Sequence, residues 1–174
     1  MQRIIQRSIK ETVDLKQLAE LIPKYAVVKK YDQLKGNTLK DVMGNKTVLI
    51  VLWNIHDKKH RTLNKPGHFW VISTRGPEKG PVVFSSTGMS YKKELFITQS
   101  DPTLLERILP ANTIYNTTKL QINDDSNTCW RYCLLFCYFS KLGLKQFVSL
   151  FSRPHVVLQS SDQLATALTL MTLF

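Results

Sequence analysis

The sequence predicts a single α+β domain over residues 1–174, with a mostly antiparallel sheet packed against a buried central helix. The length of 174 residues fits one domain, and 43% apolar residues are enough to form a core. Short β-branched runs alternate with stretches of helical periodicity. Residues 129–142 are apolar almost all round, which is typical of a helix inside a core. The order helix, strands, helix, strand, buried helix, helix indicates the α+β class.

The first half of the chain contains one predicted helix and three predicted strands. Residues 11–21 carry apolar side chains at helical spacing and predict an amphipathic helix. The β-branched run at 46–54 predicts a buried strand, which a polar loop rich in Lys and His follows. A second strand is expected at 67–74. A turn at 75–81 leads to a third strand at 82–86, in a hairpin-like arrangement.

The second half is predicted to contain three helices and one strand. Asp101 followed by Pro102 is a helix start, because the carboxylate can cap the helix and proline needs no N–H there. A strand is expected at 113–122. A polar loop then precedes the buried helix, and Gly143 is its predicted C-cap. The last predicted helix covers residues 162–170.

The charge of the chain is positive and uneven. Lys and Arg number 24 and Asp and Glu 13, a net charge of +11. Residues 1–80 hold 16 basic against 7 acidic side chains, a net of +9, whereas residues 81–174 hold 8 against 6, a net of +2. The basic front half favours an anionic partner, with nucleic acid first. The alternative is a soluble surface with spread lysines, because the sequence contains no arginine-rich tract.

The three cysteines predict reduced thiols. Cys129, Cys133 and Cys137 are spaced by four residues, so on a helix they share one face and do not pair with one another. This pattern favours an intracellular or intravirion setting. The first residues contain no apolar signal-peptide core, and no apolar run reaches 18 residues, so we expect no membrane span.

Cys129 is the candidate nucleophile. It lies where a polar loop ends and the buried helix begins, and the positive end of a helix favours a thiolate. The alternative is a small packing residue, which is how we interpret Cys133 and Cys137.

His68 is the candidate base, because it lies on a predicted strand that would hold its side chain rigidly. His56 and His60 fall in a charged loop with few carboxylates, which disfavours a metal site there. His155 follows Pro154 in a turn-like stretch. Each histidine taken alone is more often structural or solvated than functional.

Three segments together resemble the adenain-like cysteine proteases, a group that includes the adenovirus maturation protease and the SUMO-deconjugating proteases. They are G-H-F-W-V-I at 67–72, V-V-F-S-S-T-G at 82–88 and L-Q-I-N-D-D-S-N-T-C-W-R-Y-C at 120–133. In this family a His is followed by an acidic residue about one hairpin later, then by a Gln, then by the Cys at a helix start. The resemblance covers roughly residues 10–142 and implies a papain-like or adenain-like fold.

The resemblance assigns His68 as base, Cys129 as nucleophile and Gln121, with the backbone N–H of Cys129, as the oxyanion hole. Asn123 is the rival donor. The acid position falls on Ser85, 17 residues after His68, so a hydroxyl or a nearby carbonyl would orient the imidazole. Glu78 lies in the turn and is expected to point elsewhere.

The sequence also departs from the family at the residue after the candidate base and at the residue after the candidate nucleophile. Phe69 follows His68 where the family usually has Trp, and Trp130 follows Cys129 where the family usually has Gly.

The resemblance implies a cysteine endopeptidase, and the small size and positive charge of the chain favour a viral maturation protease. By the same resemblance, its substrates would be capsid and core precursor polypeptides, cleaved beside small residues such as Gly. No cofactor and no metal are expected. We expect a monomer without membrane association, in the virion or the host cell interior (cytoplasm or virus factory), with viral DNA as a further partner. The alternatives are a ubiquitin- or SUMO-like deconjugating protease, or a catalytically inert basic protein of this fold that binds DNA or the capsid.

Overall fold

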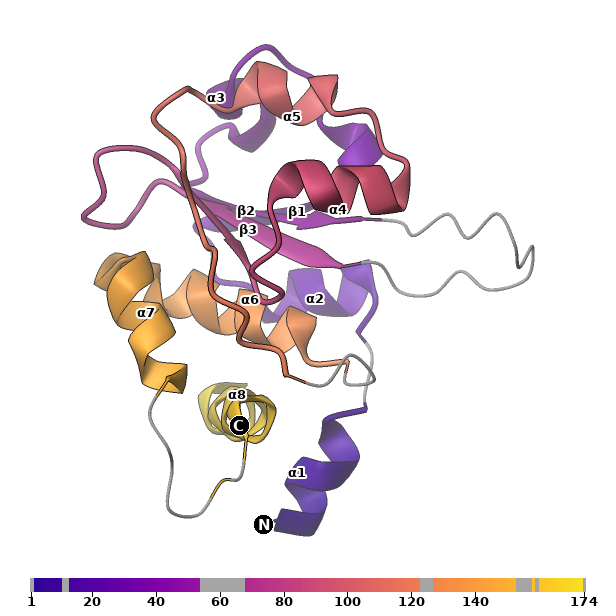
Figure 1. Cartoon of the computed structure of the whole chain (residues 1–174), viewed down its shortest axis with the longest axis vertical. Helices are drawn as coiled ribbons and strands as arrows, with labels where there is room; N and C mark the ends of the chain where they lie inside the picture. The colour runs from indigo at the N-terminus through magenta and orange to yellow at the C-terminus, as the bar shows by residue number, and fades with distance from the viewer. Residues whose placement is uncertain are drawn as a thin grey trace.

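A five-stranded sheet lies between two layers of helices (Figure 1). The computed structural model describes residues 2–10, 13–53, 68–122, 127–152, 158 and 160–173. The strands lie side by side in chain order: β1 Ala26–Lys30, β2 Val48–Leu52, β3 Phe69–Ser73, β4 Val82–Ser85 and β5 Ile114–Tyr115.

The sheet is mixed, so the prediction of a mostly antiparallel sheet is wrong. The central pairs β2–β3 and β3–β4 are antiparallel, whereas the outer pairs β1–β2 and β4–β5 are parallel. The reason lies in the connections, because a strand that follows a helical crossover lies parallel to the strand before it. The chain crosses over through α3 between β1 and β2, and through α4 and α5 between β4 and β5.

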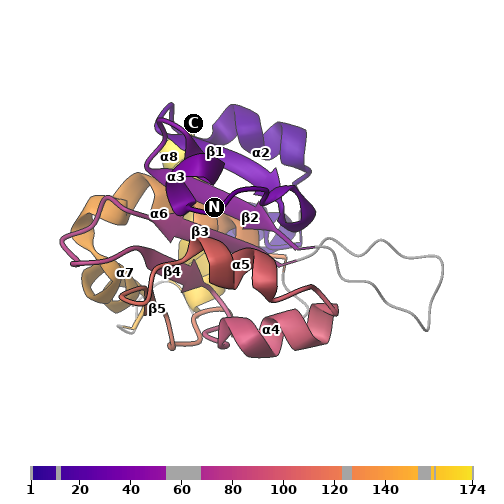
Figure 2. The same cartoon turned by 90° about the horizontal axis from the view of Figure 1, so that it is seen from above.

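The crossover helices α3 (Leu39–Met43), α4 (Tyr91–Thr98) and α5 (Thr103–Ile108) cover one face of the sheet. The view from above shows all three lying across this face (Figure 2). Their apolar residues pack with Trp53 and Trp70, whose rings meet edge to face with centroids 4.8 Å apart.

The opposite face carries the central helix α6 (Cys129–Phe139), together with α2 (Leu15–Leu21), α7 (Leu144–Phe151) and α8 (Ser161–Leu173). Eight of the eleven residues of α6 are buried, which confirms the prediction of a helix inside the core. Every second side chain of the strands points to this face and packs against α6. For example, Phe84 of β4 stacks on Phe136 of α6, with ring centroids 4.9 Å apart.

Most predicted elements are present, and the corrections concern elements at the periphery. The strand expected at 113–122 is limited to two residues, because from Asn116 onward the backbone leaves the sheet and the Asn116 side chain bonds to the carbonyls of Ser85 and Thr118. Five elements were not predicted from the sequence, namely α1 (Gln2–Ser8), β1, α3, α4 and α7. The prediction that Gly143 caps the buried helix is wrong by one turn: α6 ends at Phe139 with Ser140 as its C-cap, and Gly143, with a φ of +81°, ends the short 3-10 helix Ser140–Leu142 that follows.

The three cysteines form no disulfide, in agreement with their spacing. In the part of the chain that the structure describes, no helix has the length and apolar character needed to cross a membrane.

We predict that the free energy of unfolding falls as the pH rises above about 9, the ordinary pKa of a thiol. Burial raises the pKa of Cys133 and Cys137 well above that value and also raises the pKa of the Tyr132 phenol. Between the unfolded and the folded pKa, the folded chain holds protons that the unfolded chain has lost. Each such group therefore lowers stability by ~1.4 kcal/mol per pH unit.

Urea denaturation at pH values from 7 to 11 measures this slope. The variant Cys137→Ala is the control, because it removes one buried thiol and should flatten the slope above pH 9. A stability that stays level up to pH 11 would contradict the prediction.

Candidate active site

His68 lies one residue before β3, at the N-terminal end of the central strand of the sheet. Its carbonyl accepts a hydrogen bond of 2.9 Å from the Trp53 backbone N–H, which extends the β2–β3 ladder by one pair. Alternation along the strand therefore places the half-buried His68 side chain on the same side as Trp70, the side covered by α4.

The first turn of α6 contacts the residue that follows His68. The Phe69 backbone N–H makes a hydrogen bond to the Cys129 thiol, and the Cys133 thiol donates to the Phe69 carbonyl at 3.2 Å. The two cysteines thus hold the start of α6 against the peptide next to His68. Two segments 61 residues apart in the sequence (68 and 129) meet at this point.

The surroundings of Cys129 favour the protonated, neutral form of its thiol. Burial raises its pKa to about 11, and the negative charge of Glu94 adds to this increase. Backbone hydrogen bonds from Phe69, Trp130 and Cys129 itself lower the pKa in part. The expectation that the helix start alone favours the thiolate is therefore wrong, because loss of hydration outweighs the N–H groups of the first turn.

Gln121 lines the same cavity as His68. This cavity has a volume of about 420 Å³. The Gln121 side chain is 5% exposed, and its Oε1 accepts a hydrogen bond of 3.1 Å from the Ser86 hydroxyl. Its backbone N–H donates to the Ser86 carbonyl at 3.0 Å. Ser86 therefore holds both the main chain and the carboxamide of Gln121, with the amide oxygen turned toward β4.

Ser85, at the predicted acid position, is buried against a carboxylate from another element. Its Oγ donates to Glu94 Oε1 at 2.9 Å. The same carboxylate accepts from the Thr87 hydroxyl at 2.5 Å and from the indole N–H of Trp70. Glu94, which is 2% exposed, thus supplies a negative charge beside Ser85.

Sequence reasoning missed Glu94. The spacing from His68 pointed to Ser85, and the run of Lys92, Lys93 and Glu94 looks like a solvated face. The available signal was Ser90, a helix-capping residue, because it begins a helix that places Glu94 one turn later beside the buried Leu95.

A second buried carboxylate, Asp162, supports the start of α6 from the C-terminal helix. Asp162 is 3% exposed and accepts hydrogen bonds from the Thr128 hydroxyl at 2.8 Å and from the Tyr132 hydroxyl at 3.0 Å. The Tyr132 and Ser161 hydroxyls also lie 3.2 Å and 2.5 Å from the Leu120 carbonyl. Helix α8 therefore holds the residue before Cys129 and the residue before Gln121 in one network.

Several other candidates lie outside the described residues, namely His56, His60, Asn123 and His155. Glu78 points away from the site, as expected, and its Oε1 accepts the Leu144 backbone N–H at 2.6 Å. The described ranges contain no cluster of His, Cys, Asp and Glu side chains that could hold a metal ion.

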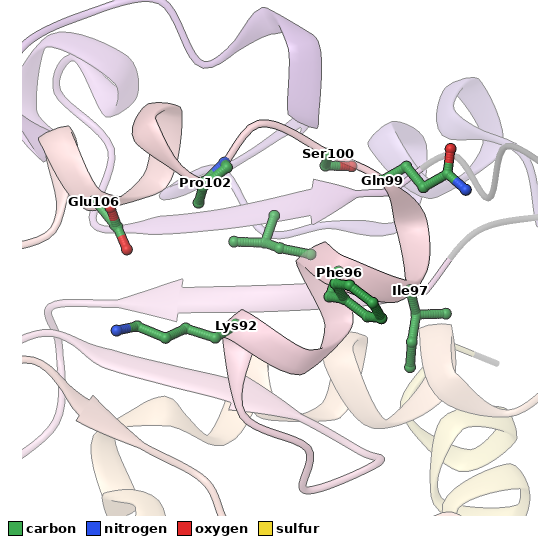
Figure 3. Close-up of a pocket in the computed structure, with 8 residues that line it drawn as sticks. Lys92, Phe96, Ile97, Gln99, Ser100, Pro102 and Glu106 are labelled. Carbon is green, nitrogen blue, oxygen red and sulfur yellow. The ribbon is translucent and has the colours of Figure 1, made fainter.

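A larger cavity of about 910 Å³ lies between α4 and α5. Figure 3 shows Lys92 and Phe96 from α4 and Glu106 from α5 around it. Among the described residues, none of the predicted site residues lines this cavity. The cavity that contains His68 and Gln121 is therefore the candidate active site.

Comparison of the chain with models of known protein families finds no match, and no curated protein is similar in sequence. The assignments of Cys129, His68, Gln121 and Ser85 therefore stay predictions, supported by geometry.

We predict that Cys129 in the variant His68→Ala reacts with iodoacetamide along a pH curve whose midpoint is near 11, its raised pKa. Adding Glu94→Gln should lower this midpoint, because the carboxylate charge disfavours the thiolate. Mass spectrometry of the labelled peptide measures the reaction at each pH.

The matched control is Glu106→Gln in the same His68→Ala background. Glu106 is an exposed carboxylate that lines the larger cavity, so its removal should leave the curve unchanged. A midpoint near 9, or one that Glu94→Gln does not move, would contradict the role given to burial and to Glu94.

Proposed function

We propose that this protein is a cysteine endopeptidase of the adenain-like type. Two observations support the proposal: the Phe69 backbone N–H, next to His68 in the chain, bonds to the Cys129 thiol, and His68 itself shares a cavity with Gln121. In this proposal a nucleophile, a base and an oxyanion donor come from three segments that are distant in the chain.

In the first step, His68 takes the proton of the Cys129 thiol, and the sulfur attacks the carbonyl carbon of the substrate peptide. A C–S bond forms, and the carbonyl oxygen gains the negative charge. His68 then gives the proton to the amide nitrogen as the C–N bond breaks, and the amine leaves. Water, deprotonated by His68, hydrolyses the thioester and releases the carboxylate, and the thiol regains its proton.

His68 is essential to this reaction because Cys129 is neutral in its own environment. A thiol whose pKa is about 11 is almost fully protonated near pH 7, so it needs a base within reach. Ser85 and Glu94 lie on the side of the sheet to which the strand alternation directs His68. We propose that Glu94, through Ser85 and Thr87, stabilises the imidazolium, which a neutral serine alone cannot do.

Gln121 and the N–H groups at the start of α6 stabilise the oxyanion in this mechanism. Because the Gln121 oxygen bonds to Ser86, its NH₂ group is on the opposite side of the carboxamide and can donate. A donor of this kind contributes about 3 kcal/mol to transition-state stabilisation in comparable sites.

The proposed substrates are capsid and core precursor polypeptides, as in viral maturation proteases, which the protein resembles in its motifs and positive charge. Cleavage of ubiquitin- or SUMO-like conjugates in preference to such precursors would favour the deconjugating class instead.

We predict that a peptide carrying a thiol-reactive group labels Cys129, and that His68→Ala reduces the rate near pH 7 by at least about a hundredfold, the usual contribution of a general base. Cys133 and Cys137 serve as internal controls, because both are fully buried and should stay unlabelled in the folded protein. The variant His60→Ala is the matched control for loss of a histidine.

Mass spectrometry of the labelled peptides decides the outcome. Equal labelling of all three cysteines, or labelling that His68→Ala leaves unchanged, would support the catalytically inert alternative.

We also propose double-stranded DNA as a partner of the basic front half, residues 1–80, where exposed lysines include Lys16, Lys24 and Lys40.

We predict that the affinity of the protein for DNA falls at least about tenfold between roughly 50 and 200 mM salt, because bound lysines release counterions from the phosphates. Titration with fluorescent DNA measures this. Lys24→Glu with Lys40→Glu should weaken binding more than Lys145→Glu in the second half, and equal effects would contradict a front-half site.

A further inference from the structure

We propose that the cavity beside His68 and Gln121 binds an acidic side chain of the substrate polypeptide, and that Lys93 and Lys119 select it. This inference rests on the proposed function and adds a substrate class to it: polypeptides with Asp or Glu within a few residues of the cleaved bond.

The cavity places His68 and Gln121 beside two lysines. Its described lining consists of six residues: His68, Thr87, Met89, Lys93, Lys119 and Gln121. None of these six is a carboxylate. Its volume of about 420 Å³ is in the range of sites that hold a small ligand or one or two side chains.

The two lysines come from segments that the fold brings together. Lys93 lies in the first turn of α4, which Ser90 caps, and Lys119 lies in the segment between β5 and α6. The loop that leads into α4 touches the Lys119 segment at Gly88. The φ of Gly88 is +64°, and a Cβ atom on this residue would be 2.6 Å from the Lys119 backbone nitrogen. Only glycine permits this approach, so the backbone under Lys119 is fixed against the end of β4.

Hydrogen bonds hold the Lys119 segment in place on both sides. The Asn116 side chain donates to the Ser85 carbonyl at 2.6 Å, and the Leu120 backbone N–H donates to the Ser86 carbonyl at 2.8 Å. Lys119 is therefore presented from a rigid support, at the edge of the cavity that Gln121 lines.

The described lining of the cavity carries positive charge from Lys93 and Lys119. Glu94, the neighbour of Lys93, is buried and accepts hydrogen bonds from Trp70, Ser85 and Thr87, so its carboxylate lies on the inner side of α4. Lys93 is exposed and lines the cavity. A cleft lined by ammonium groups attracts carboxylates and disfavours other cations.

Met89 and Thr87 also line the cavity, and they suit the side chain of Asp or Glu, in which methylene groups carry the carboxylate. Met89 offers a flexible thioether that packs against methylene groups, and Thr87 lies at the junction with the Glu94 network. The site thus has apolar contact for the stem of Asp or Glu and positive charge for its end.

A mixed peptide library tests the inference whatever sequence the protein cleaves. Mass spectrometry of the products identifies the cleaved bonds. We expect Asp and Glu to be enriched within about three residues of the cut. In the double variant Lys93→Glu, Lys119→Glu the preference should invert toward Lys and Arg.

Matched synthetic peptides that differ by Glu, Gln or Lys at the enriched position then measure the size of the effect. We expect kcat/KM about tenfold higher for Glu than for Gln at low salt, in line with two partly exposed ion pairs. Lys92→Glu is the control, because Lys92 lies on the same helix but lines the larger cavity (Figure 3), so the preference should remain.

The outcomes separate the two proposals. Cleavage that requires Cys129 and His68 but shows no acidic preference, or a preference that survives in the double variant, would overturn this inference and leave the peptidase intact. A library in which no cleavage depends on Cys129 and His68 would overturn the proposed function and, with it, the role given to the lysines.

Discussion

The contact between the first turn of α6 and the Phe69 peptide is the constraint on which the rest of the site depends. Cys129 and Cys133 bond to the N–H and the carbonyl of one residue in β3. Cys133 is fully buried, and only a small side chain fits between a helix and a strand backbone at this distance. The close approach sets where the helix begins relative to the backbone of β3, one residue after His68.

Two buried carboxylates stabilise this arrangement from opposite faces of the sheet. Asp162 bonds to Thr128 and Tyr132 on the α6 side, and Glu94 bonds to Trp70 and Ser85 on the α4 side. A buried carboxylate is costly unless donors surround it, and each of these accepts at least two hydrogen bonds. Glu94 comes from α4, between β4 and β5, and Asp162 comes from α8, after α6, so both networks depend on packing between elements that are distant in the chain.

Helix α4 shows how one short element can serve two surfaces. Glu94 faces inward to the hydrogen-bond network, whereas Lys93 is exposed and lines the cavity, and Phe96 is 84% exposed beside the larger cavity. Adjacent residues on a helix point about 100° apart, so acid and base neighbours in sequence face different environments. The charge run of α4 is therefore divided between the interior, which Glu94 faces, and the cavity that Lys93 lines.

The sequence by itself determined the central elements, and it predicted His68, Gln121 and Cys129 as candidate catalytic residues. Their signals are local: the β-branched runs of β2 to β4, the all-round apolar character of α6 and the helix start at Cys129 are properties of neighbouring residues. Only the tertiary structure decided the parallel outer strands, the raised pKa of Cys129 and the arrival of Glu94 beside Ser85. These depend on contacts between segments distant in the chain, because pairing direction, hydration and charge at a site are set by what packs around it, and no local pattern encodes that.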